Sequence, residues 1–265
     1  MNFIFSLSRW NAFSTNKVWV GFGNFKQLFQ DDIFWHALRN NIFYVIISVF
    51  FQGGISLLIA AILEQKWIRS FSGIFRTVYF LPSVLSLTMV ALLWQMLFNP
   101  TIGLINVFTD ILGLPPSDIL GSSKTSIFGV IAVSQWQWVG YTTFLYVIGI
   151  QGIPYERYEA AMIDGAGEFT RFRMITIPGC RETILLVLTT TIIGAFKVFD
   201  EVYIMTGGGP GRSSEVLGTL LYRSAFRNDR MGYASAIAVI LFIITFCLSI
   251  FQIKMYDIKS AKDNR

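Results

Sequence analysis

Five apolar runs of about 20 residues constrain this chain more than any other feature of its sequence. They cover roughly residues 42–63, 77–98, 126–150, 183–205 and 233–253. An α-helix needs about 20 mainly apolar residues to cross the hydrocarbon core of a bilayer. The composition agrees, because 54% of the 265 residues are hydrophobic and 14% are charged, whereas soluble domains have about 25% charged residues. We therefore predict an all-α, polytopic integral membrane helical bundle with five full spans.

The polar connectors between these runs predict the orientation of the chain. Connectors 64–76, 151–182 and 254–265 together carry eleven Lys and Arg residues, and the other three connectors carry nine. The first group is much shorter, so its basic residues are about twice as dense, and such residues concentrate on the cytoplasmic side. The first group is accordingly predicted to face the cytoplasm.

The segment before the first full span has two parts. "FIFSLSRWNAF" begins apolar, but Arg9 arrives too early for a complete span, so this stretch is either a short anchor or the end of a membrane helix. Residues 24–41 have apolar side chains at helical spacing and predict an external amphipathic helix that leads into the first full span.

Several classes of function find no support in the sequence. With one histidine, His36, which lies outside the predicted spans, no metal cluster of the usual spacing can be assembled. Cys180 and Cys247 are not expected to form a disulfide, and no Ser/His or His/Glu set at membrane depth suggests an enzyme. The net charge of +5 is assigned to contact with membrane lipid, and no nucleic-acid partner is expected.

The longest cytoplasmic connector contains a polar stretch, "EAAMIDGAGEFTRFRMITIPG", at residues 159–179. Pro154 suits the start of a helix, and Glu156 suits the positive end of its first turn. Gly165 is placed to end this helix in a left-handed conformation, and Pro178 to stop a second short helix before the next span. Spacing alone also fits an ordinary amphipathic loop on the membrane surface.

The residues of this stretch closely resemble the EAA signature of bacterial ABC importer permeases. The matching positions are Glu159, Ala160, Ala161, Asp164, Gly165, Ala166, Phe172, Ile175, Ile177 and Pro178. Five further segments are similar to the carbohydrate branch of these permeases: "VGFGNFKQLF", "FRTVYFLPSVLS", "WQMLFNPTIGLIN", "VFDEVYIMTGGGPGRSSEVL" and "GYASAIAVIL". The resemblance extends over essentially the whole chain.

This resemblance implies a domain organisation and a set of partners. Residues 1–41 would be the span remnant and external segment, 42–256 the permease domain with its coupling elbow at 154–178, and 257–265 a cytoplasmic tail. The elbow would dock on an ATP-binding subunit, so the chain itself would need no cofactor. The expected assembly is a multi-pass importer of the bacterial cytoplasmic membrane. It has a second homologous permease, two ATP-binding subunits, an external solute-binding protein and a carbohydrate substrate.

Charged side chains inside an apolar run suggest a second functional region. Lys197 lies near the middle of run 183–205, with Asp200 and Glu201 three and four residues later. Such groups usually face a cavity or pair with one another, because burying them in lipid is costly. Two interpretations stay open, namely an internal ion pair and a substrate pathway. A proton or ion relay in a secondary transporter is the rival function for the same residues.

Run 126–150 carries "SQWQWVGY" at its centre rather than aromatic residues at its ends. Trp138 and Tyr141 share a helical face with Ser134, and Gln135 is adjacent. An aromatic face beside amide and hydroxyl groups suits a sugar ring. Gln135, Trp138 and Tyr141 are therefore candidate substrate-pathway residues, together with Lys197 and Asp200, although packing between helices explains the aromatic residues as well.

The glycine-rich stretch "TGGGPGRSS" at residues 206–214 does not have the spacing of a phosphate-binding loop, and no strand precedes it. A turn-rich loop at the external mouth is expected instead.

Overall fold

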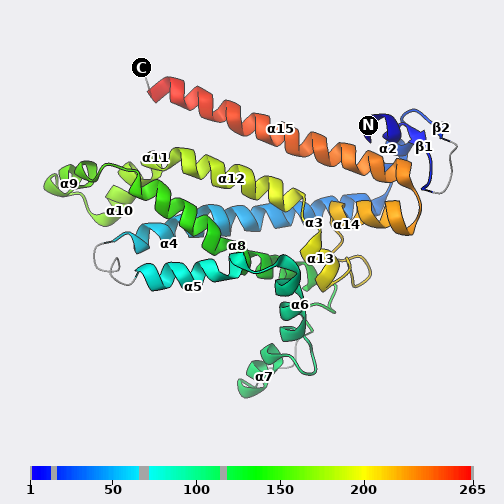
Figure 1. Cartoon of the computed structure of the whole chain (residues 1–265), viewed down its shortest axis with the longest axis horizontal. Coiled ribbons are helices and arrows are strands. Elements are labelled where there is room, and N and C mark those ends of the chain that lie inside the picture. The colour runs from blue at the N-terminus through cyan, green and yellow to red at the C-terminus, as the bar shows by residue number, and fades with distance from the viewer. Residues whose placement is uncertain (1, 13–16, 66–71, 114–117, 264–265) are drawn as a thin grey trace.

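The computed structural model describes residues 2–12, 17–65, 72–113 and 118–263, and most of them are helical, with several long helices running side by side (Figure 1). The first half contains α1 (Asn2–Ser6), α2 (Gly23–Phe29), α3 (Asp32–Ser48), α4 (Ser56–Leu63), α5 (Ser72–Val84), α6 (Leu87–Leu97) and α7 (Leu104–Ile111). The second half contains α8 (Ser126–Gln151), α9 (Tyr155–Ile163), α10 (Glu168–Arg171), α11 (Ile177–Gly179), α12 (Arg181–Phe196), α13 (Asp200–Met205), α14 (Leu217–Tyr222) and α15 (Met231–Asp263). Three π-helical segments join neighbouring helices: η1 (Val49–Ile55), η2 (Phe172–Thr176) and η3 (Arg223–Arg227).

The helices confirm a multi-span membrane protein but recover the five predicted spans only in part. Two uninterrupted rods are long and apolar enough to cross a membrane: Asp32–Leu63, with 32 residues, and Met231–Gln252, with 22. Two bent pairs qualify only in combination: Thr77–Val84 with Leu87–Leu97, at 103°, and Glu168–Gly179 with Arg181–Phe196, at 71°. Length and composition therefore give two spans in the described residues, or four if each bent pair is one span.

The predicted span 126–150 corresponds to α8, which is 26 residues long but is not among those four. The polar residues at its centre lower its mean hydropathy. α8 instead packs inside the bundle, against α4, α5, η1 and α12. More than half of its residues are buried, so most of this helix packs against other parts of the bundle.

The amino-terminal segment differs from its prediction in two respects. Residues 8–9 (β1, Ser8–Arg9) and 18–19 (β2, Val18–Trp19) form a short antiparallel pair, so the fold is all-α apart from this ladder. The expected amphipathic helix 24–41 is interrupted at Asp31, whose side chain caps α3 by accepting a hydrogen bond from the backbone N–H of Ile33 at 2.9 Å.

The segments predicted as a span remnant and as a carboxyl-terminal tail both involve α15. The first of them contains the five-residue helix α1, which packs along α15 and brings the rings of Phe3 and Phe242 to 5.8 Å. α15 continues without a break past residue 256, where we expected the tail to begin. Residues 66–71 of the first basic connector and residues 264–265 of the tail lie outside the described residues.

Close packing between α5 and α8 depends on a glycine. A Cβ atom at Gly140 would overlap the backbone carbonyl of Tyr79, which cannot move without shifting α5. Gly54 offers a contrast, because a Cβ there would meet no atom within 4 Å.

We predict that Gly140→Ala destabilises the bundle by about 1–3 kcal/mol, as expected for overpacking. Gly54→Ala is the matched control and should leave stability unchanged or raise it slightly, because alanine favours helices. Thermal unfolding of the purified variants in detergent measures the difference. Equal melting temperatures for the two variants would contradict the close contact between α5 and α8.

Candidate coupling elbow and central cavity

The predicted elbow is a helix–turn–helix unit at one end of the bundle, with α9 and α10 at the far left in Figure 1. α9 begins directly after Pro154, and Gly165 follows its end at φ +77°, where a side chain would strain the backbone. The N–H of Ala166 donates to the carbonyl of Ala161 at 2.8 Å, and that of Gly165 to the carbonyl of Met162 at 3.1 Å. These two bonds form a Schellman motif, so the helix end that the sequence predicted is confirmed.

An apolar face anchors the elbow to the bundle. Tyr158, Phe172 and Ile175 pack on a buried cluster that includes Leu57 and Val187. The Tyr158 hydroxyl also lies 3.0 Å from the Thr176 hydroxyl, which joins α9 to η2. Phe172, one of the predicted coupling residues, therefore faces the bundle.

The rest of the elbow presents an exposed surface that mixes polar and apolar groups. None of the residues of α9 or α10 is buried. The side chains of Ile163, Phe169 and Met174 are 87%, 75% and 69% exposed. Exposure of several large apolar side chains on one surface is typical of an interaction site. Of the predicted coupling residues, Glu159, Ala160, Asp164, Gly165 and Pro178 are exposed, and Ala161 and Ala166 are half-buried.

Pro178 does not stop the helix as predicted. It lies inside α11, which continues to Gly179, and the 71° bend comes at Cys180. Proline lacks an N–H and cannot complete the regular helical ladder, which accounts for the π-helical segment η2 directly before it.

Cys180 and Cys247 are both free thiols.

A cavity of about 320 Å³ lies between α3, η1, α8, α12 and α13, and we call it the central cavity. Its wall combines aromatic rings with hydroxyl, amide and charged groups. The residues that line it include Tyr44, Ser48, Gln52, Ser134, Trp138, Tyr141, Thr190, Thr191, Lys197, Asp200 and Glu201.

The structure brings four of the five predicted substrate-pathway residues to this cavity. Trp138 and Tyr141 line it with their rings in an edge-to-face arrangement, 6.1 Å apart, and Lys197 and Asp200 line it from the break between α12 and α13. Ser134 lines it too, as its shared helical face predicted. Trp136 points elsewhere, with its ring 5.4 Å from that of Trp94.

Gln135, the fifth predicted residue, does not line the cavity but supports it from behind. It is buried, and its amide nitrogen donates to the Ser48 hydroxyl at 3.1 Å. Its amide oxygen accepts from Gln52 at 3.0 Å, and the oxygen of Gln52 accepts from Thr191 at 3.1 Å. This chain of hydrogen bonds fixes three polar side chains of the cavity wall.

The charged residues do not form the internal pair that their spacing allowed. α12 ends at Phe196 and α13 begins at Asp200, so Lys197 lies in a break rather than in the middle of a helix. In the described part of the chain, Lys197 makes no ion pair with Asp200 or Glu201. Lys197 and Asp200 are exposed on the cavity wall, whereas Glu201 is 7% exposed.

A polar stripe along α3 and η1 was not predicted from the sequence. Asn40, Asn41, Tyr44, Ser48 and Gln52 are all buried and follow one another at three- and four-residue steps after the first. Hydroxyl and amide side chains repeating at helical spacing within an apolar run were the signal that could have revealed it. The stripe runs from the middle of α3 to the central cavity, which Tyr44, Ser48 and Gln52 line.

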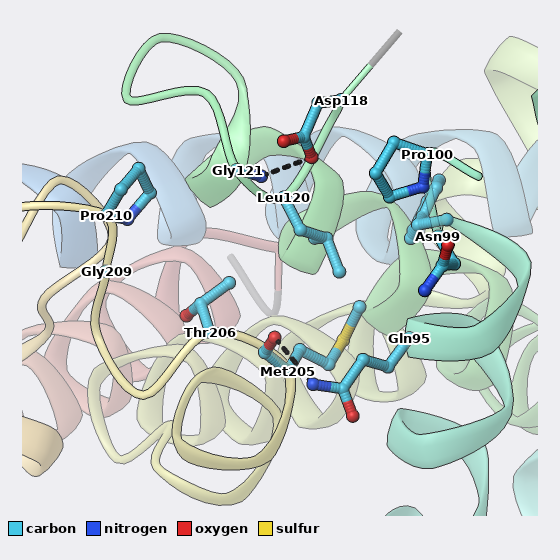
Figure 2. Close-up of a pocket in the computed structure, with 11 residues that line it drawn as sticks. Gln95, Asn99, Pro100, Asp118, Leu120, Gly121, Met205, Thr206, Gly209 and Pro210 are labelled. Atoms are coloured by element: carbon cyan, nitrogen blue, oxygen red, sulfur yellow. Dashed lines mark hydrogen bonds between the residues drawn. The ribbon is translucent and has the colours of Figure 1, made fainter.

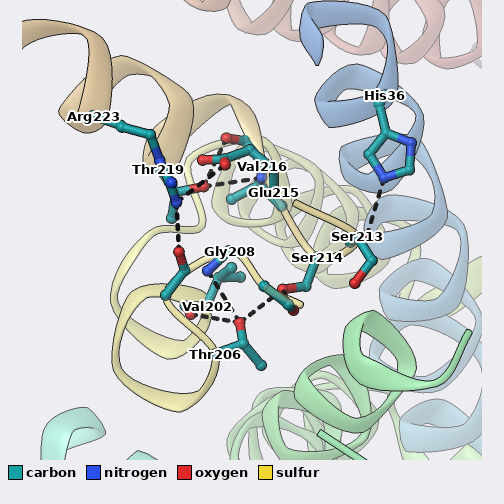
Figure 3. Close-up of polar contacts among 12 residues, drawn as sticks. His36, Val202, Thr206, Gly208, Ser213, Ser214, Glu215, Val216, Thr219 and Arg223 are labelled. Carbon is teal, nitrogen blue, oxygen red and sulfur yellow. Dashed lines mark hydrogen bonds and ion pairs between the residues drawn. The ribbon is translucent and has the colours of Figure 1, made fainter. Parts of the chain in front are cut away.

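Asn40, the first residue of this stripe, is hydrogen-bonded to the glycine-rich loop that precedes α14. Asn40 donates to the carbonyls of Ser213 and Glu215, each at 2.8 Å. His36 lies 3.1 Å from the Ser213 carbonyl (Figure 3). His36 lies near the start of the 32-residue helix Asp32–Leu63, ahead of the predicted run 42–63. The loop itself is turn-rich, with Gly207, Gly208 and Gly211 at positive φ.

A buried ion pair stiffens the same loop. The Glu215 carboxylate is fully buried and lies 3.2 Å from the Arg223 guanidinium, which also donates to the Gly207 carbonyl at 2.7 Å (Figure 3). Burial raises the pKa of Glu215 above its usual range, and the Thr219 hydroxyl and the charge of Arg223 offset this only in part.

A second pocket, of about 350 Å³, lies between the end of α6, residues 118–121 and the end of α13 (Figure 2). We call it the α6–α13 pocket. None of the predicted site residues lines it. Within the described residues, no group of three His, Cys, Asp or Glu side chains is close enough to hold a metal ion.

Comparisons with known proteins place these features in a family. Residues 52–255 match the model of the binding-protein-dependent transport system inner membrane component. The chain is 48% identical to the probable ABC transporter permease protein YurN of Bacillus subtilis, over 99% of this chain and 90% of that protein. It is 30% identical to the trehalose/maltose transport system permease protein MalF of Thermococcus litoralis, over 96% and 85% of the two chains.

The fold agrees with solved structures of similar proteins. A crystal structure of a bacterial ABC transporter involved in the import of the acidic polysaccharide alginate contains a chain that superposes with a TM-score of 0.84. The two chains are 23% identical, and the match covers 95% of this chain and 86% of that one. The chain therefore belongs to the family of binding-protein-dependent transport system inner membrane components, the permease subunits of ABC importers.

Proposed function

We propose that this permease subunit moves a carbohydrate across the cytoplasmic membrane through the central cavity. The observation that carries the proposal is the composition of the cavity wall. Trp138 and Tyr141 offer apolar ring faces, while Ser48, Gln52 and Thr191 offer hydroxyl and amide groups. A sugar ring has an apolar C–H face and many hydroxyl groups, so this combination suits it better than an ion or a purely apolar compound.

The names of several relatives support the same substrate class. Permeases from a lactose system of Rhizobium radiobacter and a multiple sugar-binding system of Streptococcus mutans are each 33% identical to this chain. A diacetylchitobiose uptake permease of Streptomyces coelicolor is 34% identical. The relative with 48% identity has no substrate in its name, so the choice among sugars rests on experiment.

As a permease of this family, the chain is the non-catalytic membrane subunit and carries no cofactor, and its importer includes an ATPase and a binding protein. We infer that the elbow of residues 154–178 is the docking element for the ATPase. Its anchored face joins it rigidly to the bundle, and its exposed face, with Ile163 and Phe169, is free for a partner. Buried apolar anchors with a polar rim are typical of protein–protein contacts.

We infer further that the importer contains a second homologous permease, two ATP-binding subunits and an external solute-binding protein. The elbow would lie on the cytoplasmic side, and the glycine-rich loop before α14 on the external side. Family membership disfavours the rival secondary transporter, since the ATPase supplies the driving force and Lys197, Asp200 and Glu201 are not needed as an ion relay.

The first test is purification of the tagged chain from its host membrane, followed by mass spectrometry and uptake assays. We expect a second permease and an ATPase to accompany the chain. Vesicles containing the assembly should take up at least one of maltose, trehalose, lactose and diacetylchitobiose when ATP and the binding protein are supplied. Uptake of none of these sugars by an intact, ATP-hydrolysing assembly would argue against the carbohydrate assignment.

The elbow predicts a specific effect of substitution at Gly165. A β-branched side chain at φ +77° costs about 1–3 kcal/mol of strain and would distort the end of α9. We expect Gly165→Val to lower ATP-driven uptake by about tenfold or more, because about 1.4 kcal/mol corresponds to a factor of ten. Gly167→Val is the matched control, because Gly167 has φ −67° and open space around it. Comparable uptake by both variants would contradict the coupling role.

Alanine substitution of Trp138, with Trp136→Ala as the matched control, tests the role of the central cavity. Removal of the Trp138 ring should raise the KM for sugar uptake by about two- to tenfold, in line with the loss of about 0.5–1.5 kcal/mol of aromatic contact. Trp136→Ala is the control, since that ring packs on Trp94 outside the cavity. Recovery of the ATPase with each variant measures assembly. If Trp138→Ala abolishes assembly, the residue serves packing rather than substrate contact.

A further inference from the structure

The α6–α13 pocket is built from three segments that are far apart in sequence. Gln95, Phe98 and Asn99 come from the end of α6, Asp118 from the segment before α8, and Met205 from the end of α13. Figure 2 shows these side chains around one shared space. The pocket is about as large as the central cavity.

Its polar side chains hold unused hydrogen-bonding capacity. The oxygen of Asn99 accepts from the N–H groups of Thr101 and Ile102, at 2.9 and 3.2 Å, which fixes the side chain. Asp118 accepts through Oδ1 from the Gly121 N–H at 2.7 Å (Figure 2). In the described part of the chain, no hydrogen bond uses Asn99 Nδ2, Asp118 Oδ2 or Gln95 Oε1. One donor and two acceptors therefore remain available to a ligand.

Apolar groups complete the wall between these polar atoms. Phe98 and Met205 are buried members of the core, and Leu120 packs against the same core. Gly121 leaves room for the Asp118 carboxylate, which a Cβ atom would displace. An apolar wall with a few fixed polar groups is the usual design of a small-molecule site, and vicinal hydroxyls of a sugar match acceptors of this kind.

The pocket lies next to the central cavity in the fold. The first two residues of α13, Asp200 and Glu201, line the central cavity, and its last residue, Met205, lines the pocket. α13 has six residues and is thus about 9 Å long, from a rise of 1.5 Å per residue. Thr206, directly after α13, is also shared between the pocket wall and the loop network of Figure 3.

The charge of the pocket restricts the ligand. Asp118 is the charged residue among the side chains that line it, all of which are described, and no Lys or Arg accompanies it. In the central cavity two carboxylates, Asp200 and Glu201, accompany the single Lys197. A ligand with its own carboxylate would meet like charge in the pocket, whereas a neutral one would not.

We propose that the α6–α13 pocket is a second carbohydrate site, which holds a neutral sugar beside the central cavity and disfavours acidic sugars through Asp118. This inference rests on the proposed carbohydrate function. It adds a second binding site outside the central cavity. It also adds a preference for uncharged sugars, which the central cavity alone does not define.

Cysteine protection in the assembled importer tests the site. Gln95→Cys places a thiol on the pocket wall, in a Cys247→Ser background because Cys180 is buried and Cys247 is exposed. The assembly in lipid nanodiscs is labelled with a charged methanethiosulfonate, with and without maltose, trehalose, lactose or diacetylchitobiose. At several times its Kd, a sugar that fills the pocket should slow labelling by about fivefold.

Two companion variants make the outcomes distinct. Ser123→Cys, an exposed and nearly isosteric change in the segment before α8 but outside the pocket, should label equally fast with every sugar. Thr190→Cys reports on the central cavity. Protection of Thr190→Cys without protection of Gln95→Cys would overturn the second site and leave the proposed function standing. Protection of neither thiol by any of the sugars would count against both.

The charge of the pocket is tested with Asp118→Asn, which keeps an acceptor for the Gly121 N–H and removes the negative charge. The Kd of galacturonate, obtained from the concentration dependence of its protection of Gln95→Cys, should fall by about threefold once Asp118→Asn is added, because loss of like-charge repulsion of about 0.65 kcal/mol is worth that factor. Equal protection by galacturonate with and without Asp118 would overturn the selection for neutral sugars.

Discussion

The amide side chain of Asn41 is the contact on which the arrangement of this bundle most depends. It is fully buried, and its nitrogen donates to the carbonyls of Ala195 and Phe196 at the end of α12, at 3.0 and 3.3 Å. Its oxygen accepts from the N–H of Leu217 at the start of α14, at 2.8 Å. One side chain thus satisfies the free carbonyls of one helix and a free N–H of another, which in lipid would otherwise be costly.

The cavity depends on the end of α12 inside the bundle, where Asn41 removes the cost of unpaired carbonyls because it donates hydrogen bonds to them. Without a partner for its last carbonyls, α12 would be expected to continue through residue 197 into α13, and the charged side chains of this region would then lie on one continuous helix. The break instead turns Lys197 and Asp200 toward a space shared with Trp138 and Tyr141. The hydrogen-bonded chain through Gln135 and Gln52 holds the other wall. A buried polar network of this kind fixes one arrangement, since each member is costly to leave unpaired.

Features set by local chemistry could be predicted from the sequence, and features set by distant partners could not. The end of α9 at Gly165 and the shared helical face of Ser134, Trp138 and Tyr141 were predictable. Each of these two features depends on residues that are close in the chain. The end of α12 depends on Asn41, more than 150 residues away, and the role of Gln135 depends on Gln52 and Ser48. Apolar runs likewise reveal helices but not their bends, so the 103° turn between α5 and α6 was beyond prediction.

The same contacts connect the elbow to the cavity mechanically. α12 follows the elbow after the bend at Cys180, where the N–H of Ile184 donates to the Cys180 carbonyl at 2.8 Å. Its other end, 16 residues later, carries the Asn41 bonds and adjoins the cavity wall. A helix of this length is about 24 Å long and stiff, so a force applied at the elbow reaches the cavity along one rod. An ATPase that binds the elbow differently in two states would thereby bias two arrangements of the cavity, which is all that a coupled conformational change requires.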